Sequence, residues 1–218
     1  AMYRAKASGN GQYVIYGPGM HAQTMAHLKM ETQLRRAIHN NELRLVYQPI
    51  LSLPDQKLNG FEVFVRWPQP EVQWILPSEF LPLAEETGLI LPLGAWIMEE
   101  ACHKITQWMD QGLIHKDVKL NINLSARQFQ QPNLTSMIED VLRRWPKLKG
   151  CLRLEITEKA LMARGDDHSL ILKTLQEMGA SCQIDDFGTG FSSLSNLAQL
   201  TVDALKIDRS FFINMSEH

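Results

Sequence analysis

The segment Cys182–Gly190 reads CQIDDFGTG, so an apolar stretch runs directly into two adjacent carboxylates and a glycine-rich turn. We interpret its first half as a β-strand and the rest as the loop that leaves this strand. Asp185 and Asp186 repel each other at the strand end, and a nearby multivalent cation offsets that repulsion. The glycines allow the backbone that follows to bend tightly. The segment therefore predicts one wall of a divalent-metal site.

Other predicted strands carry polar side chains at or near the same end as Asp185. These residues are Glu62, Asn123, Glu155 and Lys206. Strands that alternate with helices form parallel βα units, whose carboxyl ends meet at one rim of a sheet or barrel. The sequence thus predicts an α/β fold in which these side chains converge at that rim.

Hydrophobic periodicity and turn residues give the predicted alternation. Strands are predicted over 43–50, 58–67, 118–124, 152–156, 181–184 and 204–207. Helices are predicted over 77–87, 93–112, 134–145, 167–178 and 192–200, preceded by a connecting or docking helix over 21–41. Six strands fall short of the roughly eight that close a parallel barrel.

The composition excludes several classes of protein. The chain has 218 residues, of which 44% are hydrophobic, and a formal net charge of −2. These values are typical of a globular protein with a sizeable core, and they lack the basic footprint of a protein that binds nucleic-acid polymers. No apolar run reaches the roughly 18 residues that span a bilayer. Cys102, Cys151 and Cys182 are too scattered for a zinc site and are expected as free thiols in a reducing, cytoplasmic compartment.

Each polar residue also has an ordinary structural explanation when it is considered alone. Glu62 can face solvent, Asn123 can be a turn or helix cap, and Glu155 can be a strand-end carboxylate. Arg66 can form a salt bridge at the rim or hold a phosphate. Lys206 lies between two apolar residues, and buried Lys normally has a carboxylate or phosphate partner. Their shared position at strand ends favours a common site.

Together, the candidate ligands are oxygen donors: Glu62, Asn123, Glu155, Asp185 and Asp186. Oxygen ligands are those that Mg²⁺ and Mn²⁺ prefer. The set has enough carboxylates to hold two ions, and a two-metal site can activate water for attack on phosphorus and neutralise the leaving oxygen. Lys206 would orient that water or stabilise charge in the transition state.

The motifs, in their order along the chain, resemble those of EAL domains, the phosphodiesterases of cyclic di-GMP. The matching segments are Tyr47–Ile50, Gly60–Trp67, Asn123–Gln128, Leu154–Glu158, Asp185–Leu194 and Leu205–Phe211. The similarity covers residues 43–214. Residues 1–16 resemble the C-terminal tail of a GGDEF (diguanylate cyclase) domain. The expected boundaries are a GGDEF tail over 1–19, a linker helix over 20–42 and an EAL domain over 43–218.

The resemblance implies a TIM-like (β/α) barrel that opens cyclic di-GMP to the linear dinucleotide, using two Mg²⁺ or Mn²⁺ ions. It implies that Lys206 interacts with the attacking water or the phosphate, and that Glu158 anchors the loop over 187–193. Gln48 and Arg66 would contact the ligand. The implied metal ligands are Glu62, Asn123, Glu155, Asp185 and Asp186. The family often dimerises, so a homodimer is expected, with the loop after Asp186 and its helix near the interface.

Two departures from the family pattern bear on activity. The signature reads Glu-Val-Phe rather than Glu-Ala-Leu, and the larger side chains of Val63 and Phe64 are expected to alter the pocket wall. The sequence also stops at His218, before the family's later Glu motif and its last two strands, so we expect these 218 residues to be impaired as an enzyme. The first hypothesis is a cyclic di-GMP phosphodiesterase. The second is a receptor that binds the dinucleotide with little turnover, and the third is a scaffold with neither activity.

Overall fold

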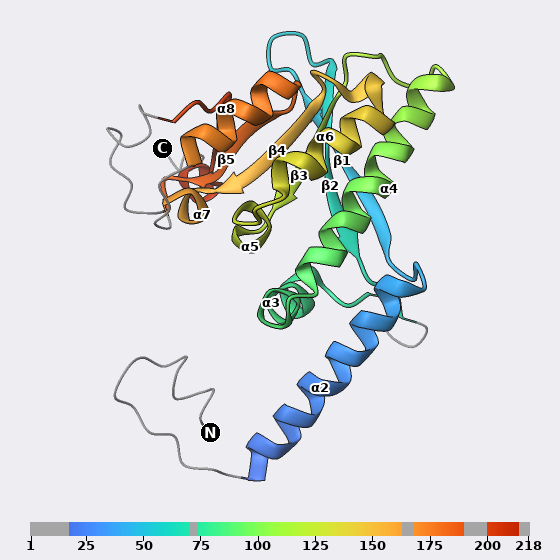
Figure 1. Ribbon diagram of the computed structural model, residues 1–218, viewed down its shortest axis with the longest axis vertical. Helices are drawn as coiled ribbons and strands as arrows, with labels where there is room; N and C mark the ends of the chain where they lie inside the picture. Colours follow the sequence, from blue (N-terminus) through green and yellow to red (C-terminus); the bar gives the residue numbers. More distant parts are fainter. Residues whose placement is uncertain (1–17, 70–73, 163–167, 190–199, 214–218) are drawn as a thin grey trace.

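The computed structural model describes residues 18–69, 74–162, 168–189 and 200–213 (Figure 1). The strands are β1 (Arg44–Leu51), β2 (Leu58–Arg66), β3 (Lys119–Leu124), β4 (Leu152–Thr157), β5 (Ser181–Phe187) and β6 (Ala204–Ile207). The longer helices are α2 (Pro18–His39), α3 (Pro77–Thr87), α4 (Ile90–Asp110), α6 (Leu134–Arg144) and α8 (His168–Met178). Shorter turns of helix are α5 (Ala126–Phe129), η1 (Pro146–Leu148), α7 (Glu158–Met162) and α10 (Ser210–Ile213).

The strands form one six-stranded sheet in the order β1-β2-β3-β4-β5-β6. The pairings from β2 to β6 are parallel, so their carboxyl ends lie at one rim, as the sequence predicts. The expectation of parallel units is wrong for the first pair, because β1 and β2 are antiparallel. Their connection over 52–57 is too short for the crossover that a parallel pair requires.

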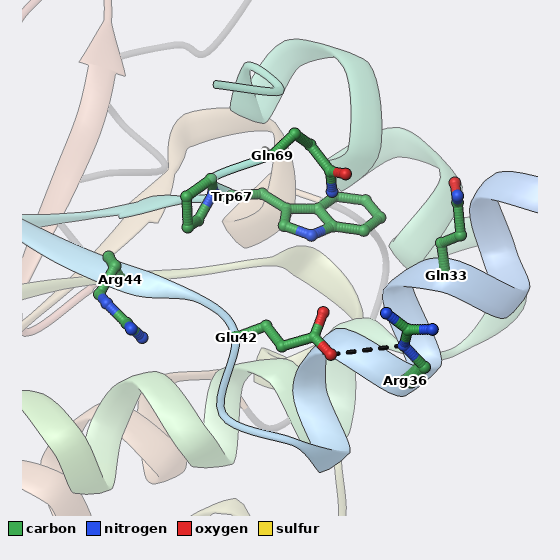
Figure 2. Close-up of a pocket in the computed structure, with 7 residues that line it drawn as sticks. Gln33, Arg36, Glu42, Arg44, Trp67 and Gln69 are labelled. Carbon is green, nitrogen blue, oxygen red and sulfur yellow. Dashed lines mark ion pairs between the residues drawn. The ribbon is translucent and has the colours of Figure 1, made fainter. Parts of the chain in front are cut away.

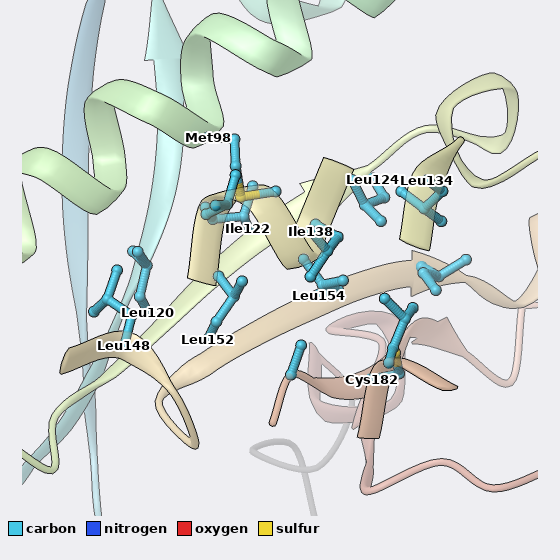
Figure 3. Packing of buried hydrophobic residues seen from close by; sticks show 14 of the residues in the cluster. Met98, Leu120, Ile122, Leu124, Leu134, Ile138, Leu148, Leu152, Leu154 and Cys182 are labelled. Carbon is cyan, nitrogen blue, oxygen red and sulfur yellow. The ribbon is translucent and has the colours of Figure 1, made fainter. Parts of the chain in front are cut away.

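Alternation along the parallel strands separates an apolar face from a polar face. On β3, Leu120 and Ile122 belong to the buried core, whereas Asn121 and Asn123 alternate with them and take the other face. The same alternation places Leu154 of β4 in the core (Figure 3). Helices α4, α6 and α8 pack around this core, which leaves the polar face free to build a site.

A second apolar cluster anchors α2 to the sheet. Leu34 and Ala37 of α2 are fully buried in this cluster, together with Trp67 and Phe80. The N-terminal part of α2 extends away from the rest of the chain in Figure 1, and Leu28 is 53% exposed. The predicted docking helix is therefore held by its last turns.

The long elements lie close to their predicted bounds, and both α3 and β6 begin and end at the predicted residues. The four short helical turns were not predicted, because three to five residues carry too little periodicity. The helix predicted over 192–200 falls almost wholly outside the described residues. The expected GGDEF tail over 1–16 lies outside them as well.

Two expectations drawn from composition can be checked in the fold. The three cysteines are free, as predicted, and all three are buried. Burial raises the pKa of both the Cys102 and Cys182 thiols to about 12, so these side chains act as core residues and not as nucleophiles. Within the described ranges, no helix combines the length and the apolar character needed to cross a bilayer.

Candidate metal centre

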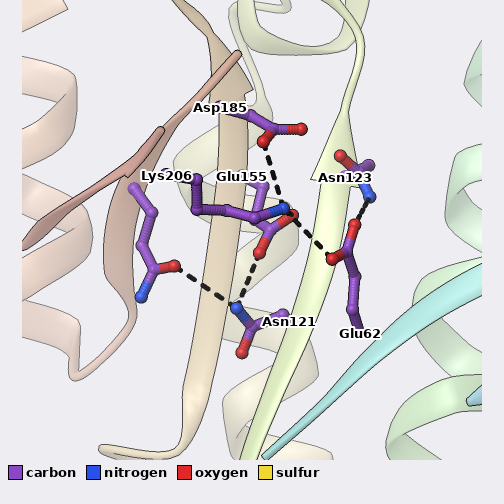
Figure 4. A network of polar contacts seen from close by, with 7 residues as sticks. Glu62, Asn121, Asn123, Glu155, Asp185 and Lys206 are labelled. Carbon is purple, nitrogen blue, oxygen red and sulfur yellow. Dashed lines mark hydrogen bonds and ion pairs between the residues drawn. The ribbon is translucent and has the colours of Figure 1, made fainter. Parts of the chain in front are cut away.

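Three carboxylates meet on the polar face of the sheet. Glu62, Glu155 and Asp185 come from β2, β4 and β5, and one oxygen of each lies within 4.8 Å of the other two. Their side chains point toward one another in Figure 4. Such close like charges are unfavourable unless a cation or a proton compensates them.

Lys206 supplies a positive charge to this cluster. Its Nζ donates to Glu155 Oε2 at 2.5 Å and to Glu62 Oε2 at 3.1 Å, and lies 3.1 Å from Asp185 Oδ1. Burial opposes the charge of Lys206, but the hydrogen bond and charge of Glu155, followed by the charges of Glu62 and Asp185, raise the pKa of its ammonium above the usual value. Lys206 is therefore cationic at neutral pH and has the carboxylate partners that its place in an apolar strand predicts.

Glu155 is the most enclosed of the three acids, with a side chain that is 0% exposed. Burial raises the pKa of its carboxyl group to about 7, although hydrogen bonds from Lys206 and Asn121 act in the opposite direction. The Asn121 amide donates to Glu155 Oε1 at 2.6 Å and to Gln183 Oε1 at 3.3 Å. Sequence reasoning gave Asn121 and Gln183 no role, although each is a polar residue that alternates with apolar ones inside a predicted strand.

Asn123 joins the cluster through Glu62. Its Nδ2 donates to Glu62 Oε1 at 3.0 Å. The alternative reading of Asn123 as a helix cap fails, because Ser125 caps α5 in a reciprocal capping box with Gln128. Asn123 therefore lies next to the last residue of β3, where it contacts one of the three carboxylates.

Asp186 and Glu158 lie beside the cluster. Asp186 adopts a left-handed backbone with φ of 53° at a register shift in β5, and it is not among the three acids whose oxygens converge. Burial, then the charges of Asp185 and Asp208, raise the pKa of its carboxyl group. Glu158 Oε2 accepts a hydrogen bond from the Gly188 backbone N–H at 3.0 Å, so it holds the start of the loop that follows β5.

The two predicted ligand contacts and the altered signature belong to β1 and β2. Gln48 pairs with Glu62 across the antiparallel ladder. The Arg66 guanidinium lies over the Phe64 ring, 5.7 Å from its centroid. Phe64 and Arg66 alternate onto the same face as Glu62, whereas Val63 is 4% exposed and packs in the core. Val63 therefore does not lie on the face of Glu62, contrary to expectation, and an effect of Phe64 on the pocket wall stays a prediction.

A groove of about 510 Å³ lies away from the carboxylates, between α2 and the adjoining ends of β1 and β2 (Figure 2). Arg36 and Glu42 form an ion pair of 3.3 Å at its edge, and Trp67 forms part of its wall. The converging acids do not line this groove. The chemistry of the site must therefore be sought at the sheet rim and not in this concavity.

The donor set fits a hard divalent cation. Three carboxylate oxygens within 4.8 Å of one another, with the side chain of Asn123 adjacent, match the all-oxygen coordination of Mg²⁺ and Mn²⁺. The ammonium of Lys206 supplies part of the positive charge that such an ion would bring.

The comparisons with known proteins agree with this geometry. The family model described as "EAL domain" matches residues 31–218. The chain is 40% identical over its full length to the bifunctional diguanylate cyclase/cyclic di-GMP phosphodiesterase MucR of Pseudomonas aeruginosa, and covers 31% of that protein. It is 34% identical to the cyclic di-GMP phosphodiesterase PdeR of Escherichia coli, with 97% of this chain and 31% of PdeR aligned. The chain thus spans about a third of the length of these relatives.

Solved structures share the fold of this chain. The PaMucR phosphodiesterase in complex with c-di-GMP matches with a TM-score of 0.81 and 39% identity, over 87% of this chain and 76% of that one. The EAL domain of FimX from P. aeruginosa bound to c-di-GMP matches with a TM-score of 0.76 and 26% identity, over 86% of this chain and 74% of that one. These likenesses confirm the predicted TIM-like α/β fold.

Proposed function

Since this chain belongs to the EAL domain family, we propose that its domain is a metal-dependent phosphodiesterase that opens cyclic di-GMP to the linear dinucleotide. The observation that carries this proposal is the convergence of Glu62, Glu155 and Asp185 around one point on the polar face of the sheet. Oxygen donors gathered in this way are costly without a cation, and a divalent ion is the usual companion of phosphate chemistry. The names of MucR and PdeR, which state that those proteins are cyclic di-GMP phosphodiesterases, support the proposal.

The residues divide into those that hold a cation and those that act on substrate. Glu62, Asn123, Glu155, Asp185 and Asp186 are the proposed ligands of Mg²⁺ or Mn²⁺, with Asp186 contributing to a second ion. Bound ions would activate a water molecule and neutralise charge on the phosphodiester. In the reaction the oxygen of one water bonds to phosphorus, one phosphorus–oxygen ester bond breaks, and the released ester oxygen takes a proton to become a hydroxyl of the linear product.

Lys206 is proposed to stabilise negative charge on the reacting phosphate. Because its pKa is raised, the ammonium keeps its protons at neutral pH and acts as a donor rather than as a base. Glu158 would fix the loop after β5 through the Gly188 N–H. Gln48 and Arg66 are proposed to contact the dinucleotide. Gln48 pairs with Glu62 across the β1–β2 ladder, and Arg66 lies on the same face of β2 as Glu62.

Hydrolysis is tested by incubating the complete EAL domain with cyclic di-GMP and Mn²⁺ or Mg²⁺ and separating the nucleotides. We expect linear dinucleotide that disappears when EDTA is added. Matched reactions use Asp185→Asn, which keeps the size of the side chain and removes its charge, and Asp117→Asn, an exposed acid that pairs with His115 outside the cluster. Absence of linear product at high protein concentration would reject the proposed phosphodiesterase activity.

The second candidate is a receptor for the same dinucleotide, and Phe64 is the observation that favours it. Phe64 lies on the face of Glu62, where the family signature has a smaller Leu. Calorimetry separates the two functions, because a receptor binds cyclic di-GMP tightly after metal has been chelated and releases no product. Lack of binding would reject the receptor.

The wider assignments are also proposals. We infer the boundaries 1–19 for a GGDEF tail, 20–42 for a linker helix and 43–218 for the EAL domain, supported by the alignment of the whole chain with the bifunctional protein MucR. The free thiols favour a cytoplasmic location. A second copy of the chain is the proposed partner, supported by exposed apolar side chains on β6 and α10, among them Ile207 and Phe212. Sedimentation of the purified protein tests the dimer.

A further inference from the structure

We propose that Asn121 is a positioning residue that, held in turn by Gln183, fixes the carboxylate of Glu155 in the orientation that faces the cation site. Glu155 is a proposed metal ligand, so this inference rests on the proposed function. The predicted set of ligands and catalytic groups does not include Asn121 or Gln183, and both lie deeper in the sheet than the rim residues.

The contacts of Glu155 define its orientation from two sides. Asn121 Nδ2 lies 2.6 Å from Glu155 Oε1, whereas Lys206 Nζ lies 2.5 Å from Oε2. Figure 4 shows Asn121 below the carboxylate and Lys206 across from it. Because the amide holds Oε1, Oε2 is left to contact Lys206, whose Nζ also contacts Glu62 Oε2 and Asp185 Oδ1.

The chemistry of these groups fixes which atom of each amide faces which partner. The NH₂ group of Asn121 faces Glu155 and donates to its Oε1, the arrangement that suits the ionised carboxylate, which only accepts hydrogen bonds. Its other N–H is directed to Gln183, which therefore presents Oε1, at 3.3 Å. Asn121 is 2% exposed and Gln183 5% exposed, so water has little access to either amide and the pair is restrained.

Asn121 carries a cost that points to a role beyond stability. Its Oδ1 is buried and has no hydrogen-bond partner among the residues that the structure describes. An unpaired buried carbonyl destabilises a fold, and an apolar side chain of similar size would avoid that cost. The benefit of the amide therefore lies in the donor that it supplies to Glu155.

Loss of this donor leaves Glu155 Oε1 without its buried partner and lets the side chain rotate. Groups that orient metal ligands typically change metal affinity by about 10–100-fold when they are removed. The test variants are Asn121→Leu, of similar volume, and Asn121→Ser, a smaller variant in case leucine prevents folding. The matched control is Thr106→Val, which also removes a buried oxygen that has no hydrogen-bond partner in the described part of the chain, on α4, a helix that carries none of the three converging acids.

Calorimetric titration of the purified chain with Mn²⁺ is the first measurement. We expect both Asn121 variants to bind Mn²⁺ at least about 10-fold more weakly than wild type, with Thr106→Val unchanged. Gln183→Leu should shift affinity in the same direction, and should add nothing to Asn121→Leu, because it acts through Asn121. If both Asn121 variants bind Mn²⁺ with wild-type affinity, the proposal is overturned. If Gln183→Leu weakens Mn²⁺ binding as much in the Asn121→Leu background as in wild type, Gln183 does not act through Asn121.

Crystal structures of the metal-free wild type and Asn121→Ser provide the second measurement, which is independent of metal binding. We expect the Glu155 carboxylate to leave its position in the variant, and an unmoved carboxylate would overturn the proposal. If the wild type binds no Mn²⁺, the proposed function fails. The two structures then still decide whether Asn121 positions Glu155.

Discussion

Replacing Lys206 by Met tests whether the acid cluster is built to hold a cation. The side chain of Lys206 is 29% exposed, and methionine has a similar length but no charge. At an effective dielectric constant of about 20, each contact of 3.1 Å between unit charges corresponds to about 5 kcal/mol of attraction. Most of this attraction is offset by the loss of hydration of the same groups.

The net effect is therefore much smaller than the sum of the contacts. Removing one partner from a buried ion pair typically costs about 3–5 kcal/mol, because the remaining charges lose their compensation. For a domain of this size, each kcal/mol shifts the melting temperature by about 2–4 °C. We expect Lys206→Met to melt roughly 6–20 °C below wild type in EDTA.

Thermal unfolding followed by circular dichroism, with EDTA or with Mn²⁺, measures both consequences. A divalent ion should restore more stability to Lys206→Met than to wild type, since it replaces the missing charge, and saturation at about 100 times Kd contributes about 2.7 kcal/mol. Lys147→Met is the control, because the pair between Lys147 and Asp110 is about half exposed and should contribute no more than about 1 kcal/mol. A Lys206 variant as stable as wild type in EDTA, or one that Mn²⁺ does not stabilise, would show that the acid cluster is not built to hold a cation.

Three further predictions concern the same rim. Glu155→Ala and Asp185→Ala should each remove most turnover in the nucleotide assay, and near-normal activity in both would show that the metal assignment is wrong. Mn²⁺ affinity should fall as the pH drops from 8 to 6, because protonation of Glu155, whose pKa is about 7, competes with the cation; a flat profile would contradict this. The stability of the metal-free fold should depend on pH in the opposite direction from Mn²⁺ affinity. The pKa of Glu155 in the folded protein lies above its usual value of 4.5, so the contribution of Glu155 to the free energy of unfolding is full below pH 4.5 and is lost as the pH rises through about 7. Val63→Ala should lower the free energy of unfolding, measured by denaturation, by about 1–3 kcal/mol without changing the affinity for the dinucleotide. Phe64→Leu should change that affinity, measured by calorimetry. The opposite pattern would mean that Phe64 packs in the core and that Val63 faces the site.

The sequence was sufficient for most of the architecture. Strands and helices follow from local periodicity, so β6 and α3 were predicted at their observed bounds. The polarity of the strand ends also predicted that Glu62, Glu155 and Asp185 would meet, because carboxyl ends of parallel strands share a rim. The antiparallel start of the sheet was missed, although the short connection between β1 and β2 carried the signal.

The role of each side chain in the site depends on how the strands assemble. In the sequence, Asn121 is simply a polar residue within an apolar strand. The register of β3 with β4 and β5 brings its side chain to Glu155 and Gln183. Val63 and Phe64 are equivalent departures in the sequence, yet the pleat sends one into the core and the other to the face of Glu62. Periodicity along a chain is a local property and can be read from sequence, whereas the distances between groups on different strands depend on register and packing, which arise only when the sheet is assembled.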